Sequence, residues 1–323
     1  MKLTNKAFIQ HIEKKYTFEK NPCVAVAVSG GPDSMSLVFL VNAFVKHKKG
    51  NVMALIVDHR IRKNSKEEAK YISTYLNKNN ITSQILTVNQ GNVSKKSMNE
   101  ARNNRYNLLT DFCNKNNFLH LFIGHHKDDN LETFLNRKIA GSDFYGLKSI
   151  SEFSLHNKVC IIRPLLNYSK DALLNYNMKN KINYINDPSN FDLEYTRPTI
   201  RNFLKKSDKK IIKEINKDFE NILFYSPYFI QMIFEILLKN IVYVDSKKIV
   251  VDLHNIKNLN EIISENIIRR IYQFLFYQSN APRSKKTRIL ISEMKKLNFN
   301  IFNLKGMIVK KNDDFLTFSR KSV

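Results

Sequence analysis

The N-terminal half of the chain alternates short, mostly apolar segments with segments of helical periodicity, and this alternation limits the folds open to it. The apolar segments are Val24–Val28, Val52–Val57, Ile81–Val88 and Leu119–Ile123. The helical segments between and after them are Ser34–Val45, Lys66–Asn77, Asn99–Cys113 and Asp128–Ile139. Strands that are apolar along their length are buried on both faces. The pattern predicts an α/β fold, a parallel sheet with helices on both faces, in which ligands bind beyond the carboxyl ends of the strands.

Beyond about residue 150 the pattern becomes mostly helical. Val159–Ile162 predicts one further strand, and Ser169 opens the helix that follows. The later helical segments are Lys209–Lys239, Ile262–Tyr277 and Thr287–Leu297, and the tail reads as two short strands around a turn at residues 311–314. We therefore expect a boundary between residues 205 and 215. It separates a first domain, residues 1–210, from a small, mainly helical C-terminal domain, residues 211–323.

The charge of the chain favours a polyanionic partner. The formal net charge is +24 at pH 7, which is more than solubility requires. Lys and Arg side chains that meet phosphates release condensed counterions, so a basic excess is typical of nucleic-acid-binding proteins. The alternative is an AT-rich coding sequence, which also enriches Lys, Asn and Ile.

The cysteines and the N-terminus exclude several classes of protein. Cys23, Cys113 and Cys160 are odd in number and far apart, and no C-x-x-C pair occurs, which argues against a disulfide scaffold and a zinc ribbon. The first residues contain no long apolar core, and no stretch reaches the roughly 18 apolar residues of a membrane span. We expect a cytoplasmic protein with no membrane partner. An organellar location stays open, in which case a transit peptide would be absent from this sequence.

The first strand ends in the turn Ser-Gly-Gly-Pro-Asp-Ser, residues 29–34, which leads directly into a helix. Backbone N–H groups and the helix dipole at such a turn attract anions. The candidate phosphate-binding residues are Ser29, Gly30, Gly31, Pro32, Asp33 and Ser34. A carboxylate among phosphate donors makes sense if a divalent cation bridges Asp33 to the phosphates. No lysine follows the glycines, so this is neither the P-loop pattern nor G-x-G-x-x-G. The alternative is an ordinary strand-to-helix turn.

Two further segments carry candidate binding residues. Asp58 and His59 follow the second strand, where an adenine or ribose is expected to lie, although Ser65 nearby could simply cap the next helix with Glu68 as its partner. In "NEARNNRY", Arg102 and Arg105 share a helix face, as phosphate- or RNA-binding residues would. The alternative for these arginines is a solvated basic face.

The segment "GHHKDDNLETFL" follows the fourth strand and opens a helix. It places His125, Asp129, Glu132 and Thr133 within about one turn of each other. A His–Asp cluster can bind a transition metal, but with no cysteine in this segment and with Asp33 expected nearby, Mg²⁺ fits better. The structural alternative is that Asp128 or Asp129 only caps the helix.

These motifs together resemble the N-type ATP pyrophosphatases. Members of this superfamily cleave ATP between the α- and β-phosphates, activate an oxygen as an adenylate and release pyrophosphate. Within it, "VDHRIRKNSKEEA", "GHHKDDNLET" and "NDPSNFDLEYTRPTIR" are similar to segments of the tRNA(Ile)-lysidine synthases. Arg197 and Arg201 match that pattern, whereas Pro198 stands where an asparagine is usual. The resemblance covers about residues 22–205.

The resemblance implies a ligase that uses ATP and Mg²⁺ to join L-lysine to the wobble cytidine of tRNA(Ile) with a CAU anticodon. The lysidine formed changes decoding from AUG to AUA. It implies Asp33, Asp129 and Glu132 as catalytic residues, with Asp33 and Asp129 on the metal. The implied ATP-binding residues are those of the loop with Asp58, His59 and His125. The implied lysine- or tRNA-binding residues are Arg102, Arg105, His126, Asp129, Glu132 and Arg201. The oligomeric state stays open, a homodimer included.

Three alternatives remain from the sequence. A tRNA thiolase needs catalytic cysteines, usually paired, and the three cysteines here have no partner in sequence. A non-catalytic tRNA-binding module would be favoured by loss of Asp33 or of either glycine, and all three are present. An amidotransferase synthetase would need a glutaminase domain, for which we see no room.

Overall fold

The computed structural model describes residues 2–58, 60, 64–88, 98–142, 144–185, 196–276, 281–296 and 298–321. The chain forms two compact units, and each is described by itself. The first consists of Met1–Ala140 and Ser149–Lys213, and the second of Gly141–Lys148 and Glu214–Val323. The second unit therefore includes residues 141–148, which the sequence-based division at residue 210 assigned to the first domain.

The first unit is built on a six-stranded sheet in the order β3-β2-β1-β4-β6-β5. Its strands are β1 (Cys23–Val28), β2 (Asn51–Asp58), β3 (Thr82–Thr87), β4 (His120–Phe122), β5 (Phe153–His156) and β6 (Val159–Ile162). All pairs are parallel except β5 with β6. The parallel sheet predicted from the sequence is confirmed. The edge strand β5 was not predicted, because it is short and exposes Phe153 and Leu155 instead of burying them.

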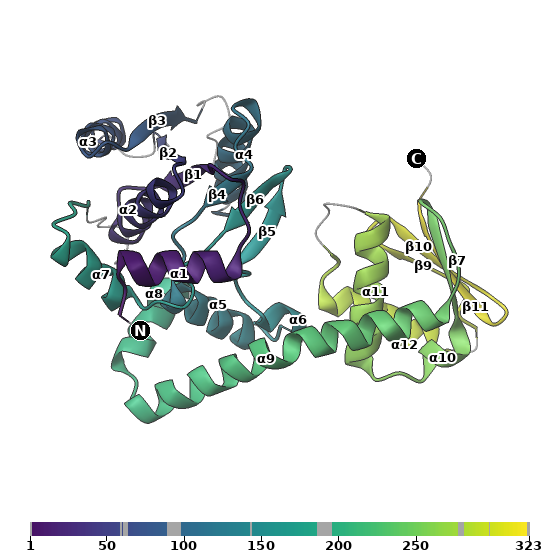
Figure 1. The fold of residues 1–323 in the computed structure, drawn as a ribbon. Coiled ribbons are helices and arrows are strands. Elements are labelled where there is room, and N and C mark those ends of the chain that lie inside the picture. Colours follow the sequence, from purple (N-terminus) through teal and green to yellow (C-terminus); the bar gives the residue numbers. More distant parts are fainter. Residues whose placement is uncertain are drawn as a thin grey trace. The chain divides into compact units, whose positions relative to one another are not determined.

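Helices cover both faces of this sheet (Figure 1). They are α1 (Asn5–Lys15), α2 (Pro32–His47), α3 (Ser65–Lys78), α4 (Met98–Lys115), α5 (Lys127–Ile139), α7 (Lys170–Lys179) and α8 (Thr196–Lys206). Val24 and Val26 of β1 belong to the core shared with α1, α2, α3 and α7. Ala25 between them belongs to a separate core, which includes Leu109 of α4. Successive strand residues thus point into opposite cores, which explains the unbroken apolar run.

Helix α3 follows the predicted spacing but not the predicted cap. Ala69, Ile72 and Leu76 are buried, as their periodicity indicates. The predicted cap by Ser65 is wrong: Asn64 is the N-cap, Ser65 is already the first helical residue, and no side chain caps the helix. The helix begins one residue earlier than the capping-box pattern suggests, so the Ser65 hydroxyl is not in the N-cap position.

The second unit combines helices with a five-stranded antiparallel sheet in the order β7-β8-β11-β10-β9. Its helices are α6 (Phe144–Leu147), α9 (Lys209–Asn240, which begins before the unit), α10 (Leu253–Lys257), α11 (Glu261–Leu275) and α12 (Ser284–Met294). The strands are β7 (Ile241–Val244), β8 (Lys248–Asp252), β9 (Ile301–Leu304), β10 (Met307–Asn312) and β11 (Phe315–Arg320). The sequence predicted α9, α11, α12 and the β10–β11 hairpin, but not the short helices α6 and α10. The other three strands are short, and β7 follows α9 with no turn between them.

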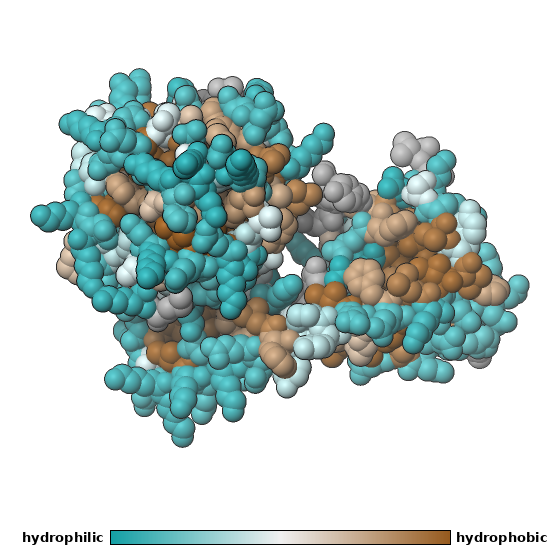
Figure 2. Space-filling view, in the orientation of Figure 1, coloured by the Kyte–Doolittle hydropathy of each residue, from teal (hydrophilic) through white to brown (hydrophobic). Residues whose placement is uncertain are grey.

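Apolar side chains remain on the surface of the second unit. Figure 2 shows them gathered over the strands of its sheet, whereas hydrophilic side chains cover most of the visible face of the first unit. In the second unit they include Val242, Tyr243 and Val244 of β7 and Ile301 of β9. Helix α9 is long and apolar enough, by length and composition alone, to cross a membrane. Core helices also pass this test, and Ile233 and Leu237 of α9 pack into the core of the unit.

We expect Gly50→Ala to destabilise the first unit strongly. Gly50 lies between α2 and β2, where a Cβ atom would be 2.1 Å from the backbone oxygen of Pro22. That oxygen also accepts a hydrogen bond from Asn51 N at 2.9 Å, so it cannot move without loss. The free energy of unfolding should fall by about 3 kcal/mol, as for other forced overpacking. Gly31→Ala is the control, because its backbone φ is −72° and the nearest atom to its Cβ position, Ser29 Oγ, lies at an ordinary contact distance of 3.6 Å. Equal urea midpoints for the two variants would contradict this account.

Candidate nucleotide and substrate site

The turn at residues 29–34 forms a loop at the carboxyl end of β1, and hydrogen bonds within the loop hold its shape. Ser34 Oγ accepts a hydrogen bond from Ser29 N at 3.2 Å and donates one to Gly31 O at 3.0 Å. Gly30 has a φ of +84°, and a Cβ atom there would lie 3.1 Å from Ile72 Cγ1. Its carbonyl accepts a hydrogen bond from Ile185 N at 2.9 Å. Glycine is therefore required at position 30 both by conformation and by space.

Helix α2 begins directly from this loop and presents an uncapped N-terminus. Gly31 is the N-cap with extended backbone, Pro32 follows in the first turn, and no side chain caps the helix. Because the first N–H groups of a helix have no partner within it, an uncapped N-terminus suits an anionic ligand. The loop and this terminus together can hold a phosphate chain.

The second part of the site comes from the start of α5. Strand β4 pairs with β1, so the segments that follow these two strands lie side by side. Gly124 passes close to the loop, because a Cβ atom there would lie 3.3 Å from Asp33 O. His126 is the N-cap of α5, and a reciprocal pair of hydrogen bonds joins it to Asp129. The expectation that Asp128 caps this helix is wrong, because Asp128 instead accepts a hydrogen bond from Lys170 N at 2.6 Å.

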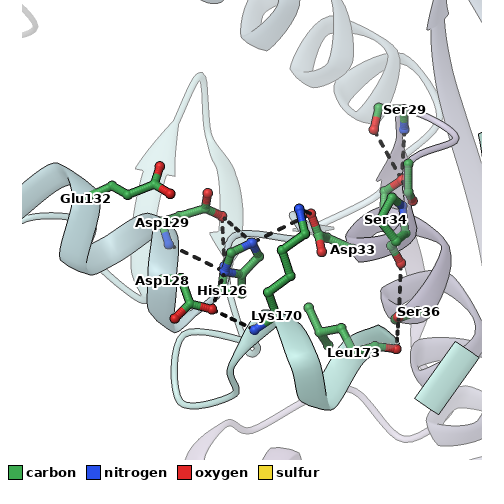
Figure 3. Close-up of polar contacts among 12 residues, drawn as sticks. Ser29, Asp33, Ser34, Ser36, His126, Asp128, Asp129, Glu132, Lys170 and Leu173 are labelled. Carbon is green, nitrogen blue, oxygen red and sulfur yellow. Dashed lines mark hydrogen bonds and ion pairs between the residues drawn. The ribbon is translucent and has the colours of Figure 1, made fainter. Parts of the chain in front are cut away.

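His126 is buried between three carboxylates (Figure 3). Its Nε2 lies 3.6 Å from Asp33 Oδ2 and 3.4 Å from Asp129 Oδ2. Its Nδ1 lies 3.6 Å from Asp128 Oδ2. The structure thus brings together Asp33 and Asp129, which the sequence predicted as neighbours from two separate motifs. It also gives His126 a place between them that sequence reasoning did not assign.

Burial and charge act in opposite directions on this cluster. Burial lowers the pKa of His126, but the nearby Asp33 and the charges of the other aspartates outweigh it, and the pKa is raised above its usual value. Burial raises the pKa of Asp33, but His126, Lys170 and Arg201 outweigh it, and the pKa is lowered. The lowered pKa of Asp33 favours an ionised carboxylate beside the His126 ring.

The residues present fit a divalent cation brought in with phosphates. Asp33 Oδ1 is buried and has no hydrogen-bond partner, and a buried carboxylate oxygen needs a cation or a donor. Among the described residues no group of three or more His, Cys, Asp or Glu side chains forms a metal site by itself. The remaining ligands would therefore have to come from phosphate and water, which is typical of Mg²⁺.

Glu132 faces Arg201 across the site. Arg201 Nε donates to Glu132 Oε1 at 2.7 Å, and Arg201 Nη2 donates to Glu132 Oε2 at 3.0 Å. The Glu132 carboxylate is buried, whereas the Arg201 side chain is 29% exposed. The hydrogen bond to Glu132 is the main reason that the pKa of Arg201 is raised. The sequence proposed both residues for substrate binding, and the structure shows that each is the partner of the other.

The remaining predicted residues lie in three places. Asp58 is buried, and its Oδ1 accepts a hydrogen bond from Arg60 N at 2.9 Å. His59 and the segment "NDPSNFDLEY" lie outside the described residues. His125 is half-buried next to His126.

Arg102 and Arg105 converge on one aromatic ring. Their guanidinium carbons lie 5.6 and 5.8 Å from the centre of the Tyr106 ring. Burial raises the pKa of Tyr106, but the charges of Arg163, Arg102 and Arg105 outweigh it, and the pKa is lowered. The alternative of a merely solvated basic face is therefore incomplete, because these arginines contact a buried tyrosine.

The fold and the loop define the class of this protein. A mainly parallel sheet whose first strand ends in a glycine-rich anion loop, with a carboxylate cluster beside it, is a nucleotide-binding α/β domain. A family model described as a PP-loop domain matches residues 3–207, and the chain belongs to this family.

Relatives and solved structures agree with this assignment. The chain is 40% identical over 204 residues to a tRNA(Ile)-lysidine synthase of Orientia tsutsugamushi, a match that covers 61% of this chain and 45% of that protein. It is 39% identical over 205 residues to one of Wolbachia pipientis (63% and 47% covered). The matches span a little under half of these relatives. A U34-tRNA thiolase of Methanococcus maripaludis shares the fold, with a TM-score of 0.55 at 19% identity over 68% of this chain and 78% of that chain.

Proposed function

We propose that the chain is an ATP-dependent ligase that attaches L-lysine to carbon 2 of the wobble cytidine in tRNA(Ile) with a CAU anticodon. The product, lysidine, would change decoding from AUG to AUA. The observation that carries the proposal is the convergence of Asp33, Asp129 and His126 beside a phosphate-binding loop, with Glu132 buried on the same helix. The names of the relatives that match this part of the chain support it.

In the first step the cytidine O2 would attack the α-phosphorus of ATP. The Pα–O bond to the β-phosphate would break, and pyrophosphate would leave with the electron pair. The backbone N–H groups of the loop and of the α2 N-terminus would orient the phosphates. Asp33 and Asp129 would hold Mg²⁺, which supplies positive charge against the phosphate oxygens when it is bound.

In the second step the ε-amine of lysine would displace AMP. The ammonium first loses a proton, and its nitrogen then bonds to C2 while the C2–O bond breaks. AMP leaves with that oxygen and the electron pair. Glu132, assisted by Asp129, would hold the ammonium and take its proton. In the structure Glu132 already pairs with a cation, the Arg201 guanidinium, and this supports its binding of a cationic substrate.

The tRNA would be bound by the basic surface, because the chain carries a net charge of +24. A cytoplasmic location belongs to the same proposal, and a homodimer remains a possible form of the active protein. A thiolase is less well supported, since the cysteines lie away from the loop. Cys23 begins β1 and Cys160 pairs with the first residue of β4, so both lie toward the amino ends of the strands, opposite to the site. Cys113 is buried in the last part of α4.

The test is incorporation of labelled lysine into tRNA(Ile) bearing CAU, in the presence of ATP and Mg²⁺. We expect incorporation that requires ATP and releases one AMP and one pyrophosphate for each lysine. tRNA(Met), which shares the CAU anticodon, is the control RNA and should accept much less. Tight tRNA binding without incorporation would favour a binding module. Pyrophosphate release without lysine transfer would indicate that a nucleophile other than lysine reacts in the second step.

A further inference from the structure

The phosphate-binding loop has no lysine of its own, but the fold brings one to it from a distant part of the chain. Lys170 is the first residue of α7. Its Nζ lies 4.0 Å from Asp33 Oδ2. Figure 3 shows the side chain extending from the start of α7, past His126, to Asp33. The sequence analysis treated this region only as the opening of a helix.

The backbone of Lys170 is fixed in place by the start of α5. Lys170 N donates a hydrogen bond to Asp128 Oδ2 at 2.6 Å. Two residues earlier, the carbonyl of Tyr168 accepts a hydrogen bond from Lys127 N at 2.9 Å. Tyr168 itself is only 1% exposed. The base of the lysine side chain is therefore held rigidly against the helix that carries Asp129 and Glu132.

The ammonium group, by contrast, forms no hydrogen bond within the described part of the chain. The side chain of Lys170 is 38% exposed. At 4.0 Å the contact with Asp33 is too long for a hydrogen bond. A half-exposed ion pair at this distance adds little stability. An ammonium has three N–H donors, so all three remain for a ligand at the loop.

We propose that Lys170 is the phosphate-contacting lysine of this site. Its ammonium donates to oxygens of the β- and γ-phosphates of ATP, and it stays with them as they become pyrophosphate. This inference rests on the proposed use of ATP. A lysine is a compact charge that binds phosphate well. Because the departing pyrophosphate gains negative charge when the Pα–O bond breaks, a fixed ammonium beside the loop lowers the energy of that step.

The competing explanation is that Lys170 serves only Asp33. The charge of Lys170 contributes to the lowered pKa of Asp33, and loss of the lysine would then weaken the site as a whole. The two explanations differ in their dependence on Mg²⁺. A phosphate-contacting lysine acts on ligands that contain the β- and γ-phosphates with or without Mg²⁺, whereas a lysine that only supports Asp33 acts through the bound cation and matters only when Mg²⁺ is present.

The experiment is calorimetric titration of the full chain with three ligands, in the presence of Mg²⁺ and again in EDTA. The ligands are α,β-methylene-ATP, pyrophosphate and AMP. The variants are Lys170→Met and Lys170→Arg, with Lys179→Met as the matched control, because Lys179 is an exposed lysine of the same helix. The methionine variant keeps the backbone N–H that binds Asp128, so we expect its thermal unfolding midpoint to match that of the wild type.

We expect Lys170→Met to raise the Kd of α,β-methylene-ATP and of pyrophosphate about tenfold or more, as loss of a charged hydrogen bond does. The Kd of AMP should change less than about twofold, because AMP lacks the phosphates in question. Lys170→Arg should keep most of the affinity, and Lys179→Met should match the wild type. Unchanged Kd values, an equal loss for all three ligands, or a loss for α,β-methylene-ATP and pyrophosphate that occurs only with Mg²⁺ would overturn the role of Lys170. A wild-type chain that binds none of them would instead overturn the proposed use of ATP.

Discussion

Replacing Asp33 by asparagine is expected to reduce ATP-dependent pyrophosphate release about a thousandfold, the scale seen when a preorganised charge is removed from an active site. One carboxylate oxygen of Asp33 is buried with no hydrogen-bond partner, and the other lies 3.6 Å from His126 Nε2. Asparagine keeps the shape but removes the charge that would hold the cation. Pyrophosphate release in a coupled assay, at saturating ATP and tRNA, measures the effect.

The matched control for this substitution is Asp111→Asn. Asp111 is an exposed residue of α4, so its substitution changes the net charge by the same amount without touching the cluster. The control should keep full activity. If Asp33→Asn retains more than about a tenth of the wild-type rate, the loop carboxylate is not part of the reaction, because electrostatic stabilisation of this kind is worth at least a hundredfold.

Breaking the pair of Glu132 and Arg201 is expected to affect both stability and lysine transfer. Arg201→Met leaves the carboxylate of Glu132 buried without its two hydrogen bonds. Loss of one partner of a buried ion pair is strongly destabilising, so the free energy of unfolding should fall by about 3 kcal/mol. Arg201→Lys keeps the charge but loses the two-pronged contact, and it should recover only part of that loss. Urea unfolding of Arg201→Met and Arg201→Lys measures these two changes in the free energy of unfolding.

Glu132→Gln separates the two steps of the proposed reaction. It should leave pyrophosphate release close to the wild-type rate but slow lysine transfer about a hundredfold, the usual effect of losing a general base. Glu67→Gln is the control, because Glu67 is an exposed residue of α3. An equal loss of both steps in Glu132→Gln would mean that Glu132 supports the site as a whole and does not act on lysine. In a double-mutant cycle of Glu132→Gln and Arg201→Met, the coupling between the two substitutions in the free energy of unfolding should reach about 2 kcal/mol.

Much of the first unit could be predicted because its signals are local. A buried parallel strand is apolar along its length, and a helix repeats its apolar residues every three to four positions. The loop at residues 29–34 and the start of α5 follow neighbouring strands, so their meeting at one edge of the sheet follows from the topology. The three unpredicted strands of the second unit have only four or five residues, which is too few to show a clear alternation of apolar and polar side chains. One of them, β8, also pairs with a strand distant in sequence, β11.

The sequence by itself determined the parallel sheet, the phosphate-binding loop and the presence of Asp33 and Asp129 at one edge. Only the tertiary structure decided that His126 stands between those two carboxylates, that Arg201 pairs with Glu132, and that the Lys170 ammonium lies 4.0 Å from Asp33. The physical reason is the distance along the chain over which each signal acts. Periodicity and turn composition act over a few residues, whereas an ion pair forms between side chains that share a place in space, and only the folded backbone decides which side chains those are.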